Sequence, residues 1–162
     1  MIAAMSRQQV ELIQYVYKGG YTSAVFSDYL EVLIDVCRKR YRGKMITVIC
    51  DNLRSHKCTD VMKVVQDDDV EMVFLPSYST EFSAIESLFG CLKNRLKDMV
   101  FSTKENLANL ITNMSKDIGI ENIESFYKLT FNEMITFLYN NQIRIKELLQ
   151  EEWGVVIIKR AT

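Results

Sequence analysis

The stretch "MITVIC" at residues 45–50 indicates the centre of a sheet. It is a near-continuous apolar run rich in β-branched residues, which fits a strand that helices bury on both faces. The run stops at Asp51 and Asn52. Because functional groups in open α/β sheets gather just beyond the carboxyl ends of the strands, the stretch also predicts where a site would lie.

Strand and helix patterns alternate on both sides of this run. Upstream, "MIAAM" and "VELIQYVY" predict two strands joined by a polar turn. Downstream, "VEMVFL" predicts a strand that Pro76 stops. Apolar residues at helical spacing predict helices over about residues 23–40, 57–67 and 84–99. This order predicts an α/β sheet with parallel crossovers.

The C-terminal part reads as helical. Ser102 and Glu105 form a capping-box pattern that opens a helix, and Gly119 has the position of its end. Beyond Gly119, apolar and aromatic residues recur mostly at three- and four-residue spacing. We therefore expect one α/β domain over residues 1–118 and a helical C-terminal extension over residues 119–162.

Composition fits one domain that folds in a reducing compartment. The 162 residues are 48% hydrophobic and 25% charged, and no apolar run is long enough to span a membrane. The four cysteines form no CxxC pair, which favours free thiols and an intracellular location, nuclear in a eukaryote and otherwise cytoplasmic. The net charge of −1 is weak for a DNA-binding protein, although "RKRYRGK" and "KNRLK" concentrate basic residues locally.

Two acids follow neighbouring strands of the predicted sheet. Asp51 comes directly after the buried strand, and Glu86 lies in the first turn of the helix after the next strand. Carboxylates at one sheet edge suit phosphodiester cleavage by divalent metals, since Mg²⁺ prefers oxygen ligands. A structural interpretation is also open, because Asp-Asn is a common turn and Ser83 with Glu86 forms a second capping-box pattern.

The two segments that carry these acids resemble the signatures of the DDE-superfamily endonucleases, which include mariner-type and bacterial insertion-sequence transposases. "VICDNLRSHK" resembles the family's strand followed by D-N and a histidine, and "FLPSYSTEFSAIESLFGCLKNRLK" resembles its second signature. Residues 52–85, thirty-four in all, separate Asp51 from Glu86. That spacing is typical of one large branch of the family.

The resemblance implies a ribonuclease-H-like mixed sheet flanked by helices and a carboxylate triad that binds two Mg²⁺ or Mn²⁺ ions. Asp51 matches the second acid and Glu86 the third, so both are expected to be catalytic and metal-binding. His56 matches the histidine after D-N; a bond to the protein backbone or to the nucleic-acid backbone of the substrate is expected for it rather than metal ligation, so it is counted among the nucleic-acid contacts. Lys93, on the same helix face as Glu86, is expected with Arg95 and Lys97 to contact DNA.

This sequence also departs from the family pattern. The family's first acid lies on a strand upstream of the segment matching "MIAAM", and none of the acids before Asp51 replaces it. We therefore expect the first strand to be missing and an exposed edge to be covered by a homo-oligomer or by a partner that supplies a strand. Serine, threonine and alanine also replace family prolines and asparagine in the loop before Glu86, and no helix-turn-helix precedes the domain.

Two functions remain open on the sequence. The first is metal-dependent cleavage and strand transfer of DNA at transposon ends, with an incomplete set of catalytic residues in this chain. The second is an inactive or domesticated relic of a mobile element that binds nucleic acid or protein. With one acid absent, we expect little or no Mg²⁺- or Mn²⁺-dependent cleavage.

Overall fold

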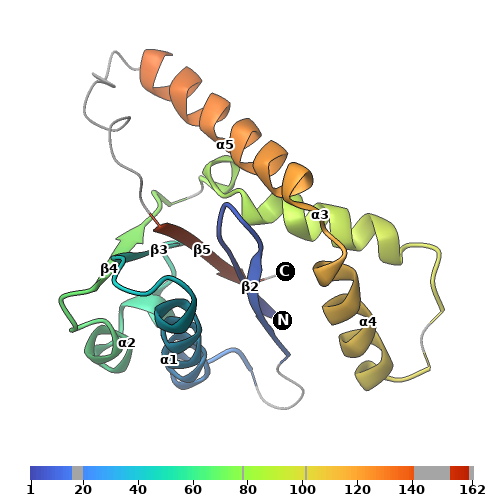
Figure 1. The fold of residues 1–162 in the computed structure, drawn as a ribbon, viewed down its shortest axis with the longest axis horizontal. Helices are drawn as coiled ribbons and strands as arrows, with labels where there is room; N and C mark the ends of the chain where they lie inside the picture. The colour runs from blue at the N-terminus through green and yellow to red at the C-terminus, as the bar shows by residue number, and fades with distance from the viewer. Residues whose placement is uncertain (16–19, 78, 101, 141–153, 161–162) are drawn as a thin grey trace.

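The computed structural model describes residues 1–15, 20–77, 79–100, 102–140 and 154–160, and these contain a mixed sheet flanked by helices (Figure 1). The strands are β1 (Ile2–Met5), β2 (Val10–Gln14), β3 (Ile46–Cys50), β4 (Val70–Phe74) and β5 (Gly154–Arg160). The helices are α1 (Ser23–Arg40), α2 (Thr59–Val64), α3 (Ile85–Leu96), α4 (Lys104–Lys116) and α5 (Ile120–Asn140). Two short 3-10 turns, η1 (Arg54–Lys57) and η2 (Thr80–Phe82), precede α2 and α3.

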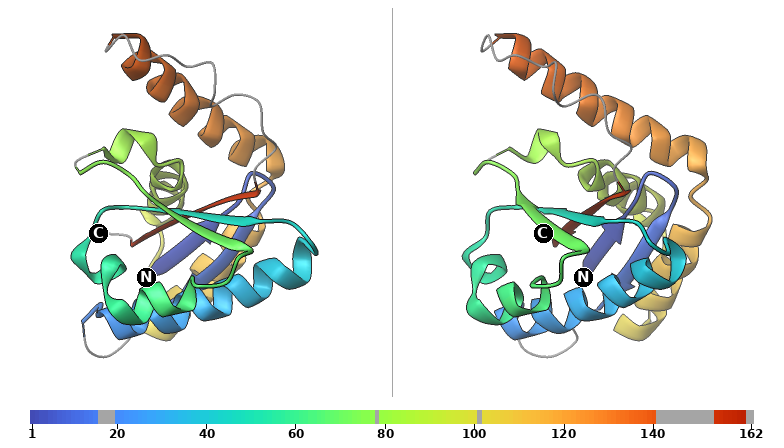
Figure 2. Two further views of the ribbon diagram at one scale, coloured as in Figure 1. Left: turned by 90° about the vertical axis from the view of Figure 1, so that its left-hand side faces the viewer. Right: turned by 60° about the vertical axis from the view of Figure 1, so that its left-hand side comes forward.

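The sheet has the order β2-β1-β5-β3-β4, so its central strand comes from the far end of the described chain. β5 runs antiparallel to β1 and parallel to β3, with Ile157 opposite both Met5 and Ile49. In Figure 2 the red β5 strand lies between the blue β1–β2 hairpin and the teal β3 strand. β5 therefore joins two pairs of strands that make no ladder with each other in the described part of the chain.

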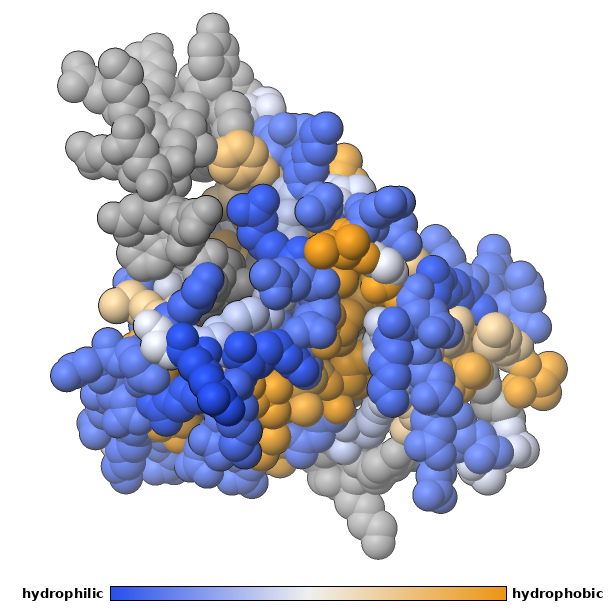
Figure 3. All heavy atoms as spheres, in the orientation of Figure 1, coloured by the Kyte–Doolittle hydropathy of each residue, from blue (hydrophilic) through white to orange (hydrophobic). Residues whose placement is uncertain are grey.

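Side chains alternate along β1 and β3 and contribute to a core on each face of the sheet. Ile2 and Ala4 pack with the buried side of α1, together with Val48 of β3. Ala3 and Met5 point to the other face, where α3, α4 and the start of α5 cover them. This period-two alternation is what lets a single short strand contribute to both cores. Figure 3 shows a largely hydrophilic outer surface over α1 and α2, with apolar residues gathered between α1 and α4.

Most predicted elements are present where the sequence places them. The mixed α/β sheet flanked by helices is confirmed, and α1 spans the predicted residues because Thr22 caps its first turn by accepting a hydrogen bond from the Val25 amide. α4 begins one residue later than the predicted box, with Thr103 rather than Ser102 as its cap. α2 is shorter than predicted, because Lys57 belongs to η1 and the helix already ends at Val64.

The C-terminal part differs from the prediction at its end. α5 is helical as expected, but Gly154–Arg160 forms a strand. The sequence "GVVIIKR" explains this, because four consecutive Val and Ile residues favour extended backbone. β5 fills the place between β1 and β3, so the described sheet has no gap for a partner strand to fill. The division of the chain after residue 118 stays a prediction.

Ion pairs fix the C-terminal end of α1 beside the sheet. Arg38 binds Asp67 and Asp69 with side-chain N–O distances of 2.6 Å, which ties α1 to the turn before β4. Arg40 pairs with the buried Glu11 of β2. The basic cluster at the end of α1 is therefore partly used within the fold.

Among the helices that the structure describes, none combines the length and apolar character needed to cross a bilayer.

Candidate active site

Asp51 directly follows β3 and is held at the end of the sheet by backbone hydrogen bonds next to it. The amide of Leu75, which follows β4, donates to the carbonyl of Cys50 at 2.8 Å. Asn52 reaches Ser77 in the loop before α3, with a side-chain distance of 3.4 Å. The end of β3 is thus tied to the segment that leads to Glu86. The Asp51 side chain is 24% exposed.

His56 lies in η1 and packs beneath Asp51. Its side chain has no solvent exposure. Nδ1 lies 2.8 Å from Asp51 Oδ1 and 3.3 Å from the Asp51 carbonyl oxygen. Nε2 lies 2.8 Å from the hydroxyl of Tyr21. The imidazole stacks on Phe26 of α1, with ring centroids 3.9 Å apart and planes at 27°.

The carboxylate of Asp51 has one oxygen that the described residues do not satisfy. Oδ1 is buried and makes no hydrogen bond of acceptable geometry, although His56 Nδ1 lies within contact distance. An ionised oxygen buried in this way is costly unless a partner compensates it. The exposed part of the carboxylate is open to a hard divalent cation, because such ions take carboxylate oxygens as ligands and offset the negative charge of the group. The donor chemistry of Asp51 therefore fits Mg²⁺ or Mn²⁺.

Glu86 is half-buried in the first turn of α3. α3 begins at Ile85, and its N-cap residue Ala84 provides no side-chain cap, whereas the capping-box pattern placed the cap at Ser83. The start of the helix is instead fixed by packing, since Ala84 and Ile85 are buried in the core that contains Ala3. Glu86 interacts with its surroundings at this position, and its role as a metal ligand stays a prediction.

The sheet register relates the two acids. Cys50 is opposite Ile158, and Ile158 is opposite Ala4. One further step along β3 brings Asp51 level with Ala3, which packs in the same core as the first residues of α3. The register thus relates Asp51 to the core beneath the start of α3, and the convergence of Asp51 and Glu86 on one ion stays a prediction. Among the described residues, no group of three or more His, Cys, Asp or Glu side chains is placed to hold a metal.

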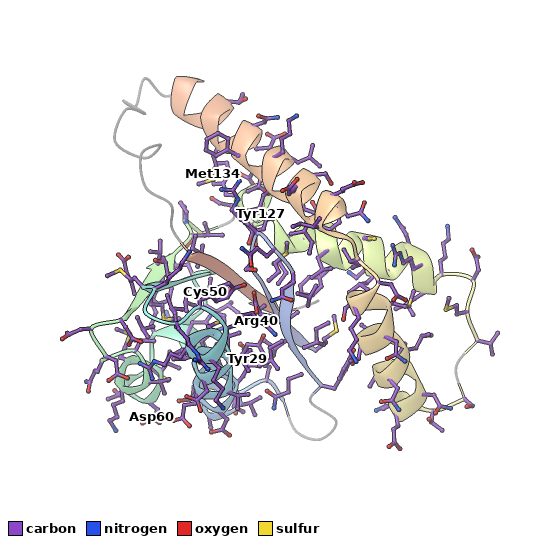
Figure 4. The ribbon with its side chains drawn as sticks, in the orientation of Figure 1. Tyr29, Arg40, Cys50, Asp60, Tyr127 and Met134 are labelled. Carbon is purple, nitrogen blue, oxygen red and sulfur yellow. The ribbon has the colours of Figure 1, made fainter. Side chains whose placement is uncertain are left out.

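Cys50 precedes Asp51 but does not extend the set of ligands. Figure 4 labels it at the sheet, where it is fully buried. Burial, with the negative charge of Asp51 as a smaller cause, raises the pKa of the Cys50 thiol to about 12. A thiol must lose its proton to bind a metal strongly, so Cys50 stays a neutral core side chain near neutral pH.

The predicted nucleic-acid contacts have two outcomes. His56 is completely buried and its Nδ1 lies 3.3 Å from the Asp51 carbonyl oxygen, so the structure gives it a backbone contact, and its role toward nucleic acid stays a prediction. Lys93 and Arg95 are exposed on the second half of α3, and Lys97 is exposed at its C-terminal cap. Their role in DNA binding stays a prediction.

Sequence reasoning missed Tyr21 and Phe26, the two aromatic residues that pack on His56. Phe26 has a signal in the sequence, but only as one apolar position of α1. Tyr21 precedes the Thr22 cap and lies thirty-five positions from His56, so no local pattern links the two. Their contact arises only when α1 packs beside η1.

The chain is similar to known proteins both in sequence pattern and in fold. A family model described as DDE superfamily endonuclease matches residues 1–108. No curated protein sequence matches the chain.

Among solved structures, the catalytic domain of Mos1 mariner transposase is similar, with a TM-score of 0.68, 16% identity, and coverage of 78% of this chain and 68% of that chain. The Mos1 catalytic domain with raltegravir and Mg has a TM-score of 0.68, 14% identity, and coverage of 77% and 67%. The Mos1 paired-end complex with the left transposon end has a TM-score of 0.67 and 15% identity. The alignment covers 75% of this chain and 37% of that chain.

Proposed function

The chain belongs to the DDE superfamily of endonucleases, and on that premise we propose that it is a transposase-derived domain for metal-dependent cleavage and strand transfer of DNA. The observation that carries the proposal is Asp51: it follows the strand β3, its backbone is fixed, and its Oδ1 is buried without a hydrogen bond. Glu86, thirty-four intervening residues further on, supplies the second acid at the same end of the fold.

Asp51 and Glu86 would hold Mg²⁺ or Mn²⁺. When bound, such ions activate the attacking oxygen and stabilise the leaving oxygen of a phosphodiester. The chain's own contribution is to fix the carboxylates before the ion arrives, Asp51 through β3 and Glu86 through the buried start of α3. Fixed ligands of this kind position substrate phosphate without reorganisation.

DNA is the proposed substrate, and transposon ends are its proposed form. The similar Mos1 structures include a paired-end complex with a transposon end, which supports this choice. The exposed Lys93, Arg95 and Lys97 give the second half of α3 a positive surface that suits phosphate contacts. A homo-oligomer remains a proposal, because paired ends require more than one copy of a catalytic domain.

A second candidate is a binding module that has lost catalysis. The observation in its favour is that the described residues offer two acids at this end and no cluster of three metal-ligating side chains. Two carboxylates suffice for a Mg²⁺ ion that also takes water and phosphate ligands. Two carboxylates would bind a second metal ion more weakly than three would. We therefore expect metal binding to persist and cleavage to be slow or absent.

One experiment separates these candidates. The full chain is titrated with Mn²⁺, and free Mn²⁺ is followed by electron paramagnetic resonance, alongside nicking of supercoiled plasmid. We expect Mn²⁺ binding that falls sharply in Asp51→Asn and Glu86→Gln. Glu81→Gln, at an exposed acid in η2, is the matched control and should bind as the parent chain does.

The outcomes are distinct. Nicking that requires both Asp51 and Glu86 supports the endonuclease, and Mn²⁺ binding without nicking supports the binding module. Mn²⁺ affinity that is equal in the parent chain and in both site variants rejects the metal site.

A further inference from the structure

A connected set of three side chains runs inward from the candidate metal ligand. Asp51 contacts His56 through Nδ1, and His56 contacts the Tyr21 hydroxyl through Nε2 at 2.8 Å. His56 is fully buried, so water does not compete for either ring nitrogen. The histidine thus bridges the site to the segment that leads into α1.

The neighbours of each nitrogen decide which of them carries the proton. Nδ1 faces two oxygens of Asp51, the carbonyl at 3.3 Å and Oδ1 at 2.8 Å, and both are acceptors. Nδ1 must therefore carry a hydrogen. In the neutral ring Nε2 is then an acceptor, and the Tyr21 hydroxyl donates to it. This assignment follows from the partners of the ring: the Asp51 oxygens only accept hydrogen bonds, whereas the Tyr21 hydroxyl can either donate or accept one.

The ring is also held in its plane. Phe26 stacks on one face of it, and the Tyr21 ring meets it edge-on at 81° with centroids 5.8 Å apart. Nδ1 consequently stays beside the Asp51 carbonyl oxygen, with Oδ1 in contact at 2.8 Å. This contact limits the rotation of the Asp51 side chain with Oδ1 buried, which leaves the outer part of the carboxylate for a ligand.

We propose that His56 is a positioning residue for Asp51 and that Tyr21 sets its tautomer. The inference rests on the proposed function, in which Asp51 binds the metal. Partners behind a metal ligand orient it and typically change metal affinity by about 10–100-fold when they are removed.

A matched pair of substitutions at His56 tests the direction of the effect. The amide nitrogen of asparagine lies close to the place of Nδ1, whereas that of glutamine reaches the place of Nε2. His56→Asn keeps the donor to Asp51, and His56→Gln loses it; both lose the stacking on Phe26. We expect His56→Gln to weaken Mn²⁺ binding by about tenfold and His56→Asn to weaken it much less. Equal losses in the two variants would contradict the proposal.

Tyr21→Phe provides a test that does not alter the imidazole. We expect it to weaken Mn²⁺ binding by a smaller factor than His56→Gln does, because the ring loses the partner that fixes its tautomer. Tyr29→Phe is the control: it removes one hydroxyl bond, to the Leu12 carbonyl at 3.0 Å, away from His56. An equal effect of the two phenylalanine substitutions on Mn²⁺ binding argues against a specific role for Tyr21.

Nitrogen-15 spectra of the full chain test the tautomer directly, because the chain has a single histidine. We expect Nδ1 to carry a hydrogen, with an Nε2 resonance that moves in Tyr21→Phe. A ring protonated only at Nε2 overturns the inference. This readout needs no metal, so it separates failure of the positioning role from failure of the metal site, which Asp51→Asn reports.

Discussion

Glu11 and Asp51 are two acids on the same sheet with different surroundings. The Glu11 side chain on β2 has no exposure, and it is paired with Arg40 and accepts a hydrogen bond from the Tyr41 hydroxyl. Asp51 after β3 is 24% exposed, and its buried Oδ1 has only the contact with His56. Glu11 is more deeply buried than Asp51, yet both of its carboxylate oxygens have partners within the fold. Incomplete pairing, rather than burial, is what marks a carboxylate as available for a ligand.

The largest expected effect comes from opening the Glu11 pair. Arg40→Met leaves Glu11 buried with Tyr41 as its remaining polar partner, so we expect a loss of about 3 kcal/mol in the free energy of unfolding. Urea unfolding followed by circular dichroism measures it. The exposed Arg42 nearby gives the control, Arg42→Met, which should change stability by less than about 0.5 kcal/mol. A loss below about 1 kcal/mol for Arg40→Met would remove the contrast between the two acids.

Isosteric amides compare the two acids directly. Glu11→Gln replaces a paired charge by a neutral group, and we expect a loss of about 2 kcal/mol because its bonds to Arg40 and Tyr41 lose charge assistance. Asp51→Asn should stay within about 0.5 kcal/mol of the parent, or stabilise it, because it removes an unsatisfied charge. Thermal and urea unfolding of both variants check the order. A larger loss in Asp51→Asn than in Glu11→Gln reverses the conclusion.

Two buried thiols report on the two acids. Burial, with Glu11 as a smaller cause, raises the pKa of Cys37 to about 11, and burial with Asp51 raises that of Cys50 to about 12. At pH 8 we expect both to react with a thiol reagent far more slowly than the half-buried Cys58 and Cys91. The measurement is a time course of labelling by mass spectrometry. Rapid labelling of Cys50 would mean that the end of β3 opens readily.

The same pKa shifts predict how stability depends on pH. A thiol whose pKa is raised by folding binds its proton more tightly in the native state. Its contribution is therefore complete below the unfolded value of 9.0 and is lost as pH rises toward about 11 and 12. We expect Cys50→Ala to reduce the slope of stability against pH in this range, and an unchanged slope would contradict that assignment.

The smallest expected effect is at an exposed pair. Hydrogen bonds from Arg38 lower the pKa of Asp69 below 3.8, and both side chains are open to solvent. A lowered pKa stabilises the fold above the unfolded value, and this contribution disappears as pH falls through the folded value. Asp69→Asn should therefore cost little at pH 7, and the difference from the parent should vanish in acid. Unfolding curves at stepped pH and low salt provide the check.

Local patterns predicted much of the fold because the relevant information was itself local. The run at residues 45–50, the Thr22 cap region and the alternation in β1 each follow from neighbouring residues. The resemblance of two short signatures identified Asp51 and Glu86. The position of β5 in the sheet could not be predicted from local patterns. A short Val- and Ile-rich segment indicates a strand, but it does not indicate which strands it pairs with. His56 likewise became a buried bridge only through Tyr21 and Phe26, which a one-dimensional pattern does not bring together.

The central position of β5 has a consequence for the order of synthesis. The β1–β2 hairpin and the β3–β4 pair leave the ribosome long before residue 154 is made, and until then β1 and β3 each present an unpaired edge. Joining Met5 to Ile157 closes nearly the whole described chain into one loop, a contact of high sequence separation that slows folding. The nascent chain thus passes through a stage with two sheet fragments and no centre. The corner at Asp51 acquires its second flanking strand only when that last insertion occurs.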